Sequence, residues 1–276
     1  MYYVRIMISN EEQEKLRARF NPDGSLLRRH QLRMLEMLKY VDGVCKKHNI
    51  KYWLCSGTLI GAVRHSGFIP WDDDLDIEML REDYKKFVKV MKEEAQTNYV
   101  LQTHETDFNY LAPYGKLRDL HSYIKENNYN DWCYKYHGVY IDVFIMDSSS
   151  SLFLNKAGNY LQYFSLFRIS KCLHNRLFRR IYLGSVFFLV HKIIFPFLRG
   201  ISLINAGGQL RHTLGSCFTK PRYKKDIFPL SQMIFEGIYF PVPYNSDNYL
   251  KNIYGNYMSL PSLDGIKSHT VYVRFD

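Results

Sequence analysis

The most constraining feature of this sequence is an acidic run, Asp72-Asp73-Asp74-Leu75-Asp76-Ile77, that follows a segment rich in small residues. We predict a strand through the end of this run. Because successive side chains of a strand point to opposite faces, Asp74 and Asp76 would share one face, and Leu75 and Ile77 would face the core. Neighbouring carboxylates repel each other unless a cation lies between them, and their hard oxygens suit Mg²⁺ or Mn²⁺. The run therefore predicts a divalent metal site.

The segment before the acidic run predicts a phosphate-binding turn. Residues 52–54 form a short apolar strand, and Ser56-Gly57-Thr58 follows as a turn. Glycine lets a ligand approach the backbone closely, and a helix that begins at Leu59 would direct N–H groups at an anion. We therefore expect Gly57 and Thr58 to contact a phosphate. The segment is neither a Walker A nor a Rossmann motif, because Gly57-x-x-x-Gly61 lacks the lysine and the spacing.

Two later segments contribute charged residues to the same predicted site. Asp142 lies inside an apolar strand predicted over 139–145, and a buried carboxylate needs a partner. We expect it to be a third metal ligand or a general base, the alternative being a carboxylate that caps a loop or pairs with a core arginine. Lys116 and Arg118 alternate along another predicted strand, so they would face the same way and hold a pyrophosphate. The alternative for these two is a pair of surface cations on an edge strand.

Four residues that flank the motif have more than one interpretation. His65 is suited by its ordinary pKa to act as an acid or a phosphate donor, or it is a hydrogen-bonded structural histidine. Arg64, beside it, is a further candidate for binding the donor. Asp72 is in phase with Asp74 if the strand begins early, and it would then support or join the metal ligands. Asp73 would point the other way and cap a turn or pair with Arg64 or His65.

This arrangement resembles the LicD family, which includes the fukutin-type proteins and has the nucleotidyltransferase fold. The resemblance is carried first by Gly57-Thr58-Leu-Ile-Gly61-Ala-Val-Arg64-His65-x-Gly67-Phe-Ile-Pro70-Trp71-Asp72-Asp73-Asp74-x-Asp76. The segment 138–147, with Asp142, resembles the second acidic strand of the family. Three C-terminal segments resemble its end motif: Phe228-Pro-Leu, Phe240-Pro-Val-Pro243 and Tyr249-Leu-x-x-Ile-Tyr254-Gly255-x-Tyr257-Met. Together these matches cover most of the chain.

The resemblance implies a reaction. Members of the family move a phospho-alcohol from a CDP-activated donor to a sugar hydroxyl of a cell-surface glycan such as a polysaccharide or lipopolysaccharide. The alcohol is choline, from CDP-choline, in one branch and ribitol, from CDP-ribitol, in another. The resemblance implies that the metal, Mg²⁺ or Mn²⁺, is held by Asp74, Asp76 and Asp142. It implies that the donor is bound by Gly57, Thr58, Arg64, His65, Lys116 and Arg118.

The residues leave open which donor is used and which class of function the chain has. A choline donor predicts an aromatic cage, for which Trp132, Tyr134 and Tyr140 are available. A metal-dependent glycosyltransferase could use the same Asp-x-Asp pattern, and it would release a nucleoside diphosphate rather than CMP. A nucleotide-binding partner in glycan assembly, without catalysis, is the third reading. The intact carboxylates favour an enzyme.

Length and composition predict an integrated α/β domain. The chain has 276 residues, of which 46% are hydrophobic, enough to bury a sizeable core. We expect a nucleotidyltransferase-like mixed sheet flanked by helices over 51–150. An N-terminal helical arm, 1–50, would pack on it, and 151–276 would form a mostly helical, apolar and basic part. Within this arrangement we expect helices over 26–48 and 81–95.

Charge and cysteine content narrow the partners and the compartment. The formal net charge of +10 favours anionic partners such as phosphates, nucleotides or anionic lipid surfaces. The sequence contains no helix-turn-helix, zinc-finger or RRM signature, so we expect no nucleic acid. Five cysteines, an odd number without a CxxC spacing, indicate reduced thiols in the cytoplasm rather than disulfides or structural zinc.

The strongly apolar segment 181–206 has three interpretations. Burial in the core is the simplest. A membrane span fits poorly, because Lys192, Arg199 and Pro196 interrupt the segment. The third is an interfacial helix on the inner face of the membrane, flanked by basic residues.

Overall fold

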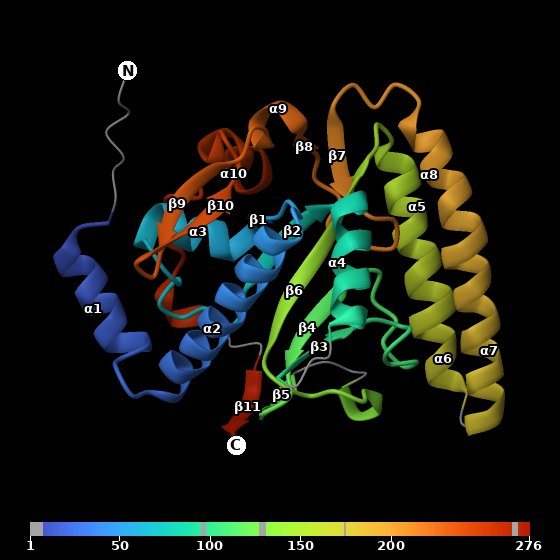
Figure 1. Cartoon of the computed structure of the whole chain (residues 1–276), viewed down its shortest axis with the longest axis horizontal. Helices are drawn as coiled ribbons and strands as arrows, with labels where there is room; N and C mark the ends of the chain where they lie inside the picture. The colour runs from blue at the N-terminus through green and yellow to red at the C-terminus, as the bar shows by residue number, and fades with distance from the viewer. Residues whose placement is uncertain (1–7, 95–97, 127–130, 174, 267–269) are drawn as a thin grey trace.

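A mixed β-sheet runs through the middle of the molecule in the computed structural model, which describes residues 8–94, 98–126, 131–173, 175–266 and 270–276 (Figure 1). The central strands follow the order β1-β2-β6-β4-β3, and β7 and β8 extend the sheet beside β6. The predicted α/β class is confirmed. The strands are β1 (Trp53–Leu54), β2 (Asp76–Leu80), β3 (Tyr99–Gln102), β4 (Gly115–Asp119), β6 (Tyr140–Ser148), β7 (Gln209–His212) and β8 (Arg222–Tyr223).

Strand β6 organises the sheet. Strand β2 pairs with the middle of β6 in parallel. Strand β4 pairs with the first half of β6 and β7 with its last three residues, both antiparallel. Buried apolar side chains such as Ile141 and Val143 alternate along it with Tyr140, Asp142 and Phe144. A strand that is paired on both sides holds its side chains in fixed positions, so β6 is a rigid support for Asp142.

Two helices cover one face of the sheet (Figure 1). Helix α2 (Leu26–Lys47) begins at Ser25, whose hydroxyl accepts a hydrogen bond from the N–H of Arg28, and buries Met34 and Leu38. Helix α4 (Arg81–Glu93) buries Phe87 among its apolar residues and exposes its lysines. Both helices were expected from three- and four-residue apolar spacing, and both are confirmed. A shorter helix, α1 (Asn10–Phe20), precedes them.

The central motif differs in two details from the sequence prediction. Helix α3 (Ser56–His65) begins at Ser56 rather than Leu59, so Gly57 and Thr58 lie in its first turn. Strand β2 begins at Asp76, so Asp74 lies in the irregular segment before it rather than inside the strand. The reason is the short partner strand: β1 has two residues, which pair only with Ile77 and Glu78.

The C-terminal part closes the sheet at the β1 edge. Strands β9 (Ser231–Phe235) and β10 (Ile238–Val242) form a hairpin whose turn, Glu236-Gly237, has positive φ angles of 50° and 78°. Glycine at the second position suits this left-handed turn. Helices α9 (Lys224–Ile227) and α10 (Ser246–Tyr254) follow the same edge. Strand β11 (Thr270–Phe275) pairs with β5 (Ser122–Glu126), and the N–H of Thr270 donates to Asp73 Oδ2 over 2.7 Å.

A helical hairpin packs beside the sheet (Figure 1). Its first arm contains α5 (Leu152–Gln162) and α6 (Ile169–Cys172), and its second contains α7 (Arg176–Phe188) and α8 (Phe195–Leu203). A π-helical turn joins the two helices of each arm. The second arm is long and apolar enough to cross a membrane by length and composition, but only 17% of its most apolar window is buried. Of the three interpretations of segment 181–206, burial in the core is therefore wrong, because few of its residues are buried.

A buried ionic cluster around Glu78 joins β2 to the C-terminal part. Glu78 is fully buried and accepts hydrogen bonds from Trp53 Nε1 (2.8 Å), Tyr249 Oη (2.7 Å) and His212 Nε2 (2.7 Å). Arg222 Nη2 lies 3.2 Å from the same carboxylate. Burial alone would raise the pKa of Glu78, but Arg222 and His212 lower it to about 2. Four separate elements thus depend on one carboxylate.

We predict that Glu78→Gln lowers the free energy of unfolding by about 3–5 kcal/mol, because it leaves the buried guanidinium of Arg222 without its counter-charge. Urea unfolding at neutral pH would measure the loss. The ionised carboxylate stabilises the fold above the ordinary pKa of 4.5, so the difference from wild type should shrink as the pH falls from 4.5 towards 2. Glu82→Gln, at a glutamate whose side chain is 76% exposed, is the matched control and should change stability by less than about 0.5 kcal/mol. Equal effects of both substitutions would contradict the central role of Glu78.

Candidate active site

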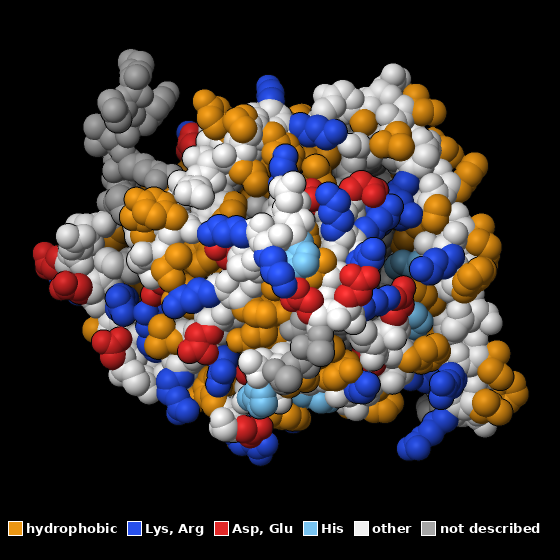
Figure 2. Space-filling view, viewed as in Figure 1, with side chains coloured by type: hydrophobic (Ala, Val, Ile, Leu, Met, Phe, Trp, Pro, Cys, Tyr) orange, Lys and Arg blue, Asp and Glu red, His pale blue; other side chains and the backbone are white. Residues whose placement is uncertain are grey.

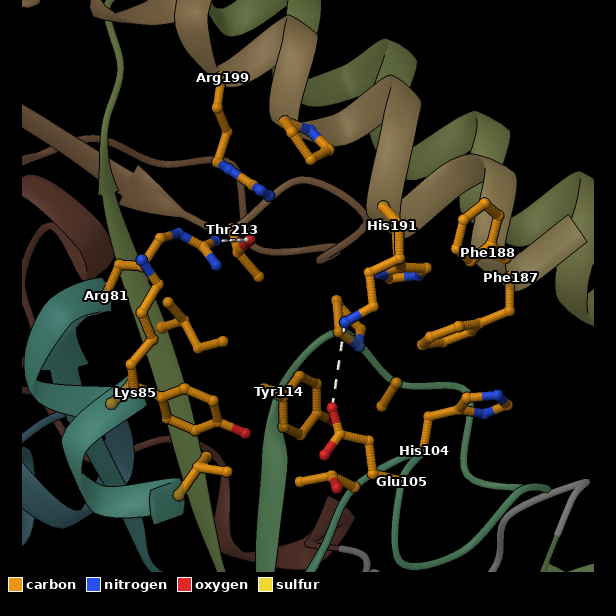
Figure 3. Close-up of a pocket in the computed structure, with 18 of the residues that line it drawn as sticks. Arg81, Lys85, His104, Glu105, Tyr114, Phe187, Phe188, His191, Arg199 and Thr213 are labelled. Carbon is orange, nitrogen blue, oxygen red and sulfur yellow. Dashed lines mark hydrogen bonds and ion pairs between the residues drawn. The ribbon is translucent and has the colours of Figure 1, made fainter. Parts of the chain in front are cut away.

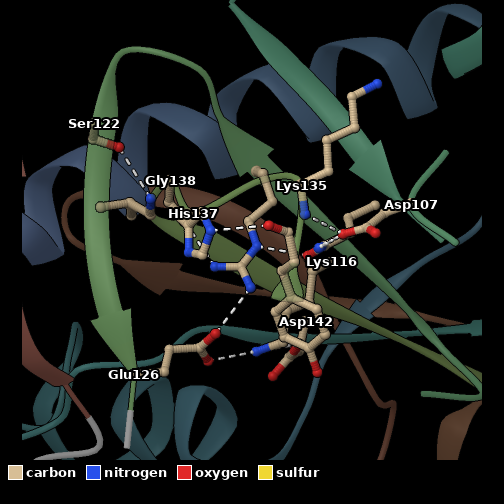
Figure 4. Close-up of polar contacts among 12 residues, drawn as sticks. Asp107, Lys116, Ser122, Glu126, Lys135, His137, Gly138 and Asp142 are labelled. Atoms are coloured by element: carbon tan, nitrogen blue, oxygen red, sulfur yellow. Dashed lines mark hydrogen bonds and ion pairs between the residues drawn. The ribbon is translucent and has the colours of Figure 1, made fainter. Parts of the chain in front are cut away.

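Two carboxylates and a lysine form a row across the sheet on the face opposite α4. Asp76 on β2 is the register partner of Asp142 on the parallel strand β6, and Asp142 is that of Lys116 on β4. Register partners on neighbouring strands point to the same side, so the three side chains are neighbours. Lys116 Nζ lies 3.3 Å from Asp142 Oδ1 (Figure 4). The structure thus places Asp142 beside Asp76, as the sequence predicts.

The start of α3 holds the acidic segment in position. The N–H of Cys55 donates to the carbonyl oxygen of Asp76 (3.2 Å), and the N–H of Asp76 donates to Thr58 Oγ1 (2.8 Å). A Cβ atom at Gly57 would lie 2.7 Å from Asp72 Oδ2, so this close approach requires glycine. Gly57 and Thr58 therefore shape the acidic segment, in addition to the phosphate contact predicted for them.

The carboxylates of the motif act on one another electrostatically. Burial raises the pKa of Asp76 well above its ordinary value, and the charges of Asp74, Asp142 and Asp72 raise it further. Burial and Asp74 also raise the pKa of Asp72. Burial raises the pKa of Asp142 to about 6, although the charge of Lys116 opposes this shift. So many carboxylates in a buried site favour the binding of a cation.

The donor set fits a divalent metal by its chemistry. Carboxylate oxygens are the ligands that Mg²⁺ and Mn²⁺ prefer. Asp142 Oδ1 is buried and has no hydrogen-bond partner among the described residues, since its approach to Lys116 is an ion pair only. In the described ranges, no three His, Cys, Asp or Glu side chains converge closely enough to form a ready-made metal site. Asp74, Asp76 and Asp142 therefore stay a predicted ligand set, supported by their charge.

Lys116 and Arg118 face the same way from β4, as their alternation predicts, and both contact Glu126. Figure 4 shows Lys116 and Glu126 pointing toward each other. Glu126 Oε1 accepts from Lys116 Nζ (3.1 Å), and its Oε2 accepts from Arg118 Nη2 (2.9 Å). Arg118 also donates to Gln102 Oε1 and to the carbonyl oxygen of Gly138, and it is fully buried. Arg118 thus positions Glu126 and Lys116, whereas the predicted contact of Arg118 with a pyrophosphate has no open surface here.

Glu126 is the site residue that sequence analysis missed. Burial would raise its pKa, but Lys116 and Arg118 lower it to about 2, so it is ionised at neutral pH. A signal was present, because β5 alternates strictly between buried and exposed residues, and Glu126 is in the buried phase with Ile124. A carboxylate in a buried phase needs cationic partners.

Arg64 and His65 are engaged elsewhere. Arg64 Nη1 donates to the carbonyl oxygens of Tyr257 (2.9 Å) and Ser259 (3.2 Å), and His65 Nδ1 lies 2.5 Å from Gln13 Oε1. Burial and the charge of Arg64 lower the pKa of His65 to about 3, so the imidazole is neutral at neutral pH. These contacts agree with the structural interpretation of His65. They join Arg64 to the C-terminal segment and His65 to the N-terminal helix α1.

The three aromatic rings considered for a choline cage are already in contact with the protein's own cations or buried. Lys116 Nζ lies 3.2 Å from the ring centroid of Tyr140. Trp132 is 74% exposed, and the guanidinium of Arg179 lies 5.8 Å from its ring centroid. Tyr134 is buried. Tyr140 thus does bind an ammonium group on its face, but that group belongs to Lys116.

Comparison with known proteins identifies a family model and similar enzymes. Residues 49–173 match the family model described as LicD/FKTN/FKRP, nucleotidyltransferase domain. The lipopolysaccharide cholinephosphotransferase LicD of Haemophilus influenzae is 28% identical over 271 residues, which cover 89% of this chain and 96% of that protein. The human ribitol 5-phosphate transferase FKRP is 46% identical over 48 residues, 17% of this chain and 10% of that protein. Similarity to the first enzyme extends along nearly the whole chain, and similarity to the second is confined to a short segment.

We predict that Asp142→Asn makes the protein more stable at pH 7, by about 1–3 kcal/mol. The pKa of about 6 in the folded state means that ionised Asp142 destabilises the fold, and the cost develops as the pH rises from 3.8 to about 6. Thermal melting at pH 7 and pH 4 would measure this, with the difference from wild type vanishing at pH 4.

The matched control is Asp147→Asn on the same strand, because Arg81 binds both oxygens of Asp147 at 2.5 and 2.6 Å. This variant should melt below wild type at pH 7. A loss of stability in both variants would show that Asp142 is a structural carboxylate, contrary to the prediction.

Proposed function

Since residues 49–173 match the LicD/FKTN/FKRP nucleotidyltransferase domain model, we propose that the chain transfers phosphocholine from CDP-choline to a sugar hydroxyl of a cell-surface polysaccharide or lipopolysaccharide and releases CMP. One observation carries this choice: similarity to a lipopolysaccharide cholinephosphotransferase extends over 89% of the chain. The row of Asp76, Asp142 and Lys116 supports phosphoryl transfer, which depends mainly on positioning and on neutralising charge.

In this proposal Asp74, Asp76 and Asp142 hold Mg²⁺ or Mn²⁺, which when bound neutralises the pyrophosphate of the donor. The donor phosphate is bound by backbone N–H groups in the first turn of α3, because no side-chain hydrogen bond caps this helix end. Lys116, held by Glu126, supplies positive charge to the departing phosphate. These residues bring the donor and the acceptor hydroxyl into line.

The transfer itself exchanges one phosphorus–oxygen bond for another. The acceptor oxygen bonds to the phosphorus distal to cytidine, and the bond from this phosphorus to the bridging oxygen breaks, so that CMP leaves with that oxygen. The hydroxyl proton passes to the carboxylate oxygen of Asp142 that does not hold the metal.

CDP-ribitol is the second candidate donor, because a segment of 48 residues is 46% identical to human ribitol 5-phosphate transferase FKRP. The short match includes no more than part of the fold, so it favours the shared chemistry more than the alcohol. We rank choline first on the greater length of the LicD match.

The test is CMP release by purified protein given Mg²⁺ and a glycan extract, with CDP-choline and CDP-ribitol in parallel. We expect magnesium-dependent CMP from CDP-choline, and a loss of at least about a hundredfold in Asp74→Ala, since the interaction with the metal is made in the transition state. The melting temperature of this variant should stay near that of wild type. CMP found attached to the acceptor, or release of a nucleoside diphosphate, would contradict the proposed reaction.

We also propose that the protein works in the cytoplasm at the inner membrane face, with the helical hairpin lying on the bilayer. Figure 2 shows apolar side chains along the hairpin edge of the molecule. The observation that supports this is the exposure of large apolar residues in a basic segment. On the second arm they are Leu177, Phe178, Ile181, Phe188, Leu189, Ile193, Phe197, Ile201 and Leu203.

We predict that the double variant Phe178→Ser/Phe197→Ser binds vesicles of phosphatidylglycerol and phosphatidylcholine at least about tenfold more weakly than wild type, because it removes two rings that would enter the interface. Co-sedimentation with vesicles would measure this. Tyr239→Ser, at a tyrosine of β10 that is 58% exposed, is the control and should bind as wild type does. Equal binding by all three proteins would rule out this surface.

A further inference from the structure

A cavity lies on the face of the sheet opposite the acidic row. It has a volume of about 610 Å³ and is bounded by α4, by the segment that joins β3 to β4, and by α7 and α8 (Figure 3). Ile145, which faces away from Asp142 on β6, forms part of its floor. The residues of the proposed transfer reaction do not line it, so its chemistry needs a separate explanation.

The cavity is lined by more cations than anions. Arg81, Lys85, Lys192 and Arg199 line it, whereas Glu105 is its one carboxylate among the described residues. Lys192 Nζ lies 4.0 Å from Glu105, a distance at which an ion pair is weak. The described lining therefore carries an excess of positive charge, which favours an anionic occupant.

Arg199 is the cation of this cavity whose charge is least accounted for. Arg81 is held by both oxygens of Asp147 and by Thr213 Oγ1 (2.6 Å). Arg199 is half-buried beside it and has no hydrogen bond or ion pair to any described residue (Figure 3). Burial lowers the pKa of Arg199 and the positive charge of Arg81 lowers it further, whereas the charge of Asp147 opposes the shift. Arg81 and Arg199 line the same side of the cavity, and two neighbouring guanidinium groups are suited to bind a phosphate group.

One wall of the cavity is aromatic and continues onto the exposed face of the hairpin. The Phe187 ring stacks between His104 and His191, with centroid distances of 3.6 and 4.1 Å. Phe188 lines the cavity and is also 59% exposed, so it belongs to both surfaces. A ligand with an anionic head and a hydrocarbon tail would find charge inside the cavity and apolar surface directly at its rim.

We propose that this cavity binds the phosphate or diphosphate of an amphiphile, with the phosphate at Arg199 and Arg81 and the hydrocarbon along Phe188 and the outer face of α7 and α8. The charge of the surrounding chain agrees with an anionic ligand, because residues 148–225 contain thirteen Lys and Arg and no Asp or Glu. Binding at this cavity does not depend on the proposed transfer reaction, and it can be measured without turnover.

The cavity and the acidic row meet at Tyr114. Tyr114 lines the cavity, and its ring lies 4.6 Å from that of Phe144, which shares a strand face with Asp142. Burial and the charges of Asp142 and Asp76 raise the pKa of the Tyr114 hydroxyl well above its ordinary value. Tyr114 thus contacts both surfaces, because it lines the cavity and packs on the strand that carries Asp142.

The experiment uses soluble ligands, so that it separates this cavity from general attachment to a bilayer. Geranyl diphosphate represents a prenyl-linked head group. Dihexanoyl-phosphatidylglycerol, used below its critical micelle concentration, represents a bilayer lipid. Inorganic diphosphate is the probe without a hydrocarbon tail. Calorimetric titration of the full chain gives the dissociation constants. We expect at least one amphiphile to bind more tightly than inorganic diphosphate, and the tighter one identifies the source of the phosphate.

Arg199→Gln should weaken the binding of that amphiphile roughly tenfold to a hundredfold, because a hydrogen bond to a charged group is lost. The arginine has no partner among the described residues, so the variant should keep the melting temperature of wild type. Lys224→Gln removes the same charge from an exposed position of α9 outside the cavity and should bind as wild type does.

Three outcomes would overturn the proposal. If inorganic diphosphate bound at least as tightly as both amphiphiles, the cavity would be a simple anion site. Equal weakening by Arg199→Gln and Lys224→Gln would show a general effect of net charge. Unchanged binding in Arg199→Gln would place the ligand elsewhere. None of these results depends on whether CMP is released from CDP-choline, so failure here and failure of the proposed reaction can be told apart.

Discussion

The repulsion between buried carboxylates is the constraint on which this architecture depends. Asp76 and Asp142 lie side by side on parallel strands, with Asp72 and Asp74 close enough to raise the pKa of Asp76. A protein interior does not collect such charges unless something compensates for them. Lys116 provides part of the compensation within the chain, and a phosphate-bound divalent cation would provide the remainder. The fold therefore holds mutually repelling carboxylates at the place where the proposed reaction needs a bound cation.

The scaffold around that site is correspondingly rigid. Strand β6 is paired along both sides, the amide of Asp76 is held by Thr58, and the Glu78 cluster fixes β2 against the C-terminal elements. Each of these contacts joins segments that are distant in sequence. Groups with complete hydrogen bonding or ion pairing stabilise the scaffold, and the carboxylates that repel one another lie together around Asp76 and Asp142.

Local patterns in the sequence predicted much of this arrangement. Apolar spacing identified α2 and α4, and strand alternation placed Lys116 and Arg118 on one face. The need of a buried carboxylate for a partner placed Asp142 beside Asp76. What could not be predicted depends on partners brought by tertiary packing. Arg118 is fully buried because Glu126, Gln102 and Gly138 surround it, and Arg64 and His65 are held by residues from both ends of the chain. Segment 181–206 is apolar on most sides, and such a sequence suits a core helix as well as an exposed one. Its residue pattern therefore could not decide between the two.

The helical hairpin is attached to the sheet by its inner side only, through small clusters such as that of Leu111, Leu166 and Leu183. Its outward side chains therefore make few contacts that the fold requires. In evolutionary terms, these positions can exchange one bulky apolar residue for another, or shift the place of a lysine, without disturbing the strands that hold the carboxylates. With the hairpin on a bilayer, as proposed, lineages whose membranes differ in lipid composition could change this surface while the residues of the acidic row stay constant.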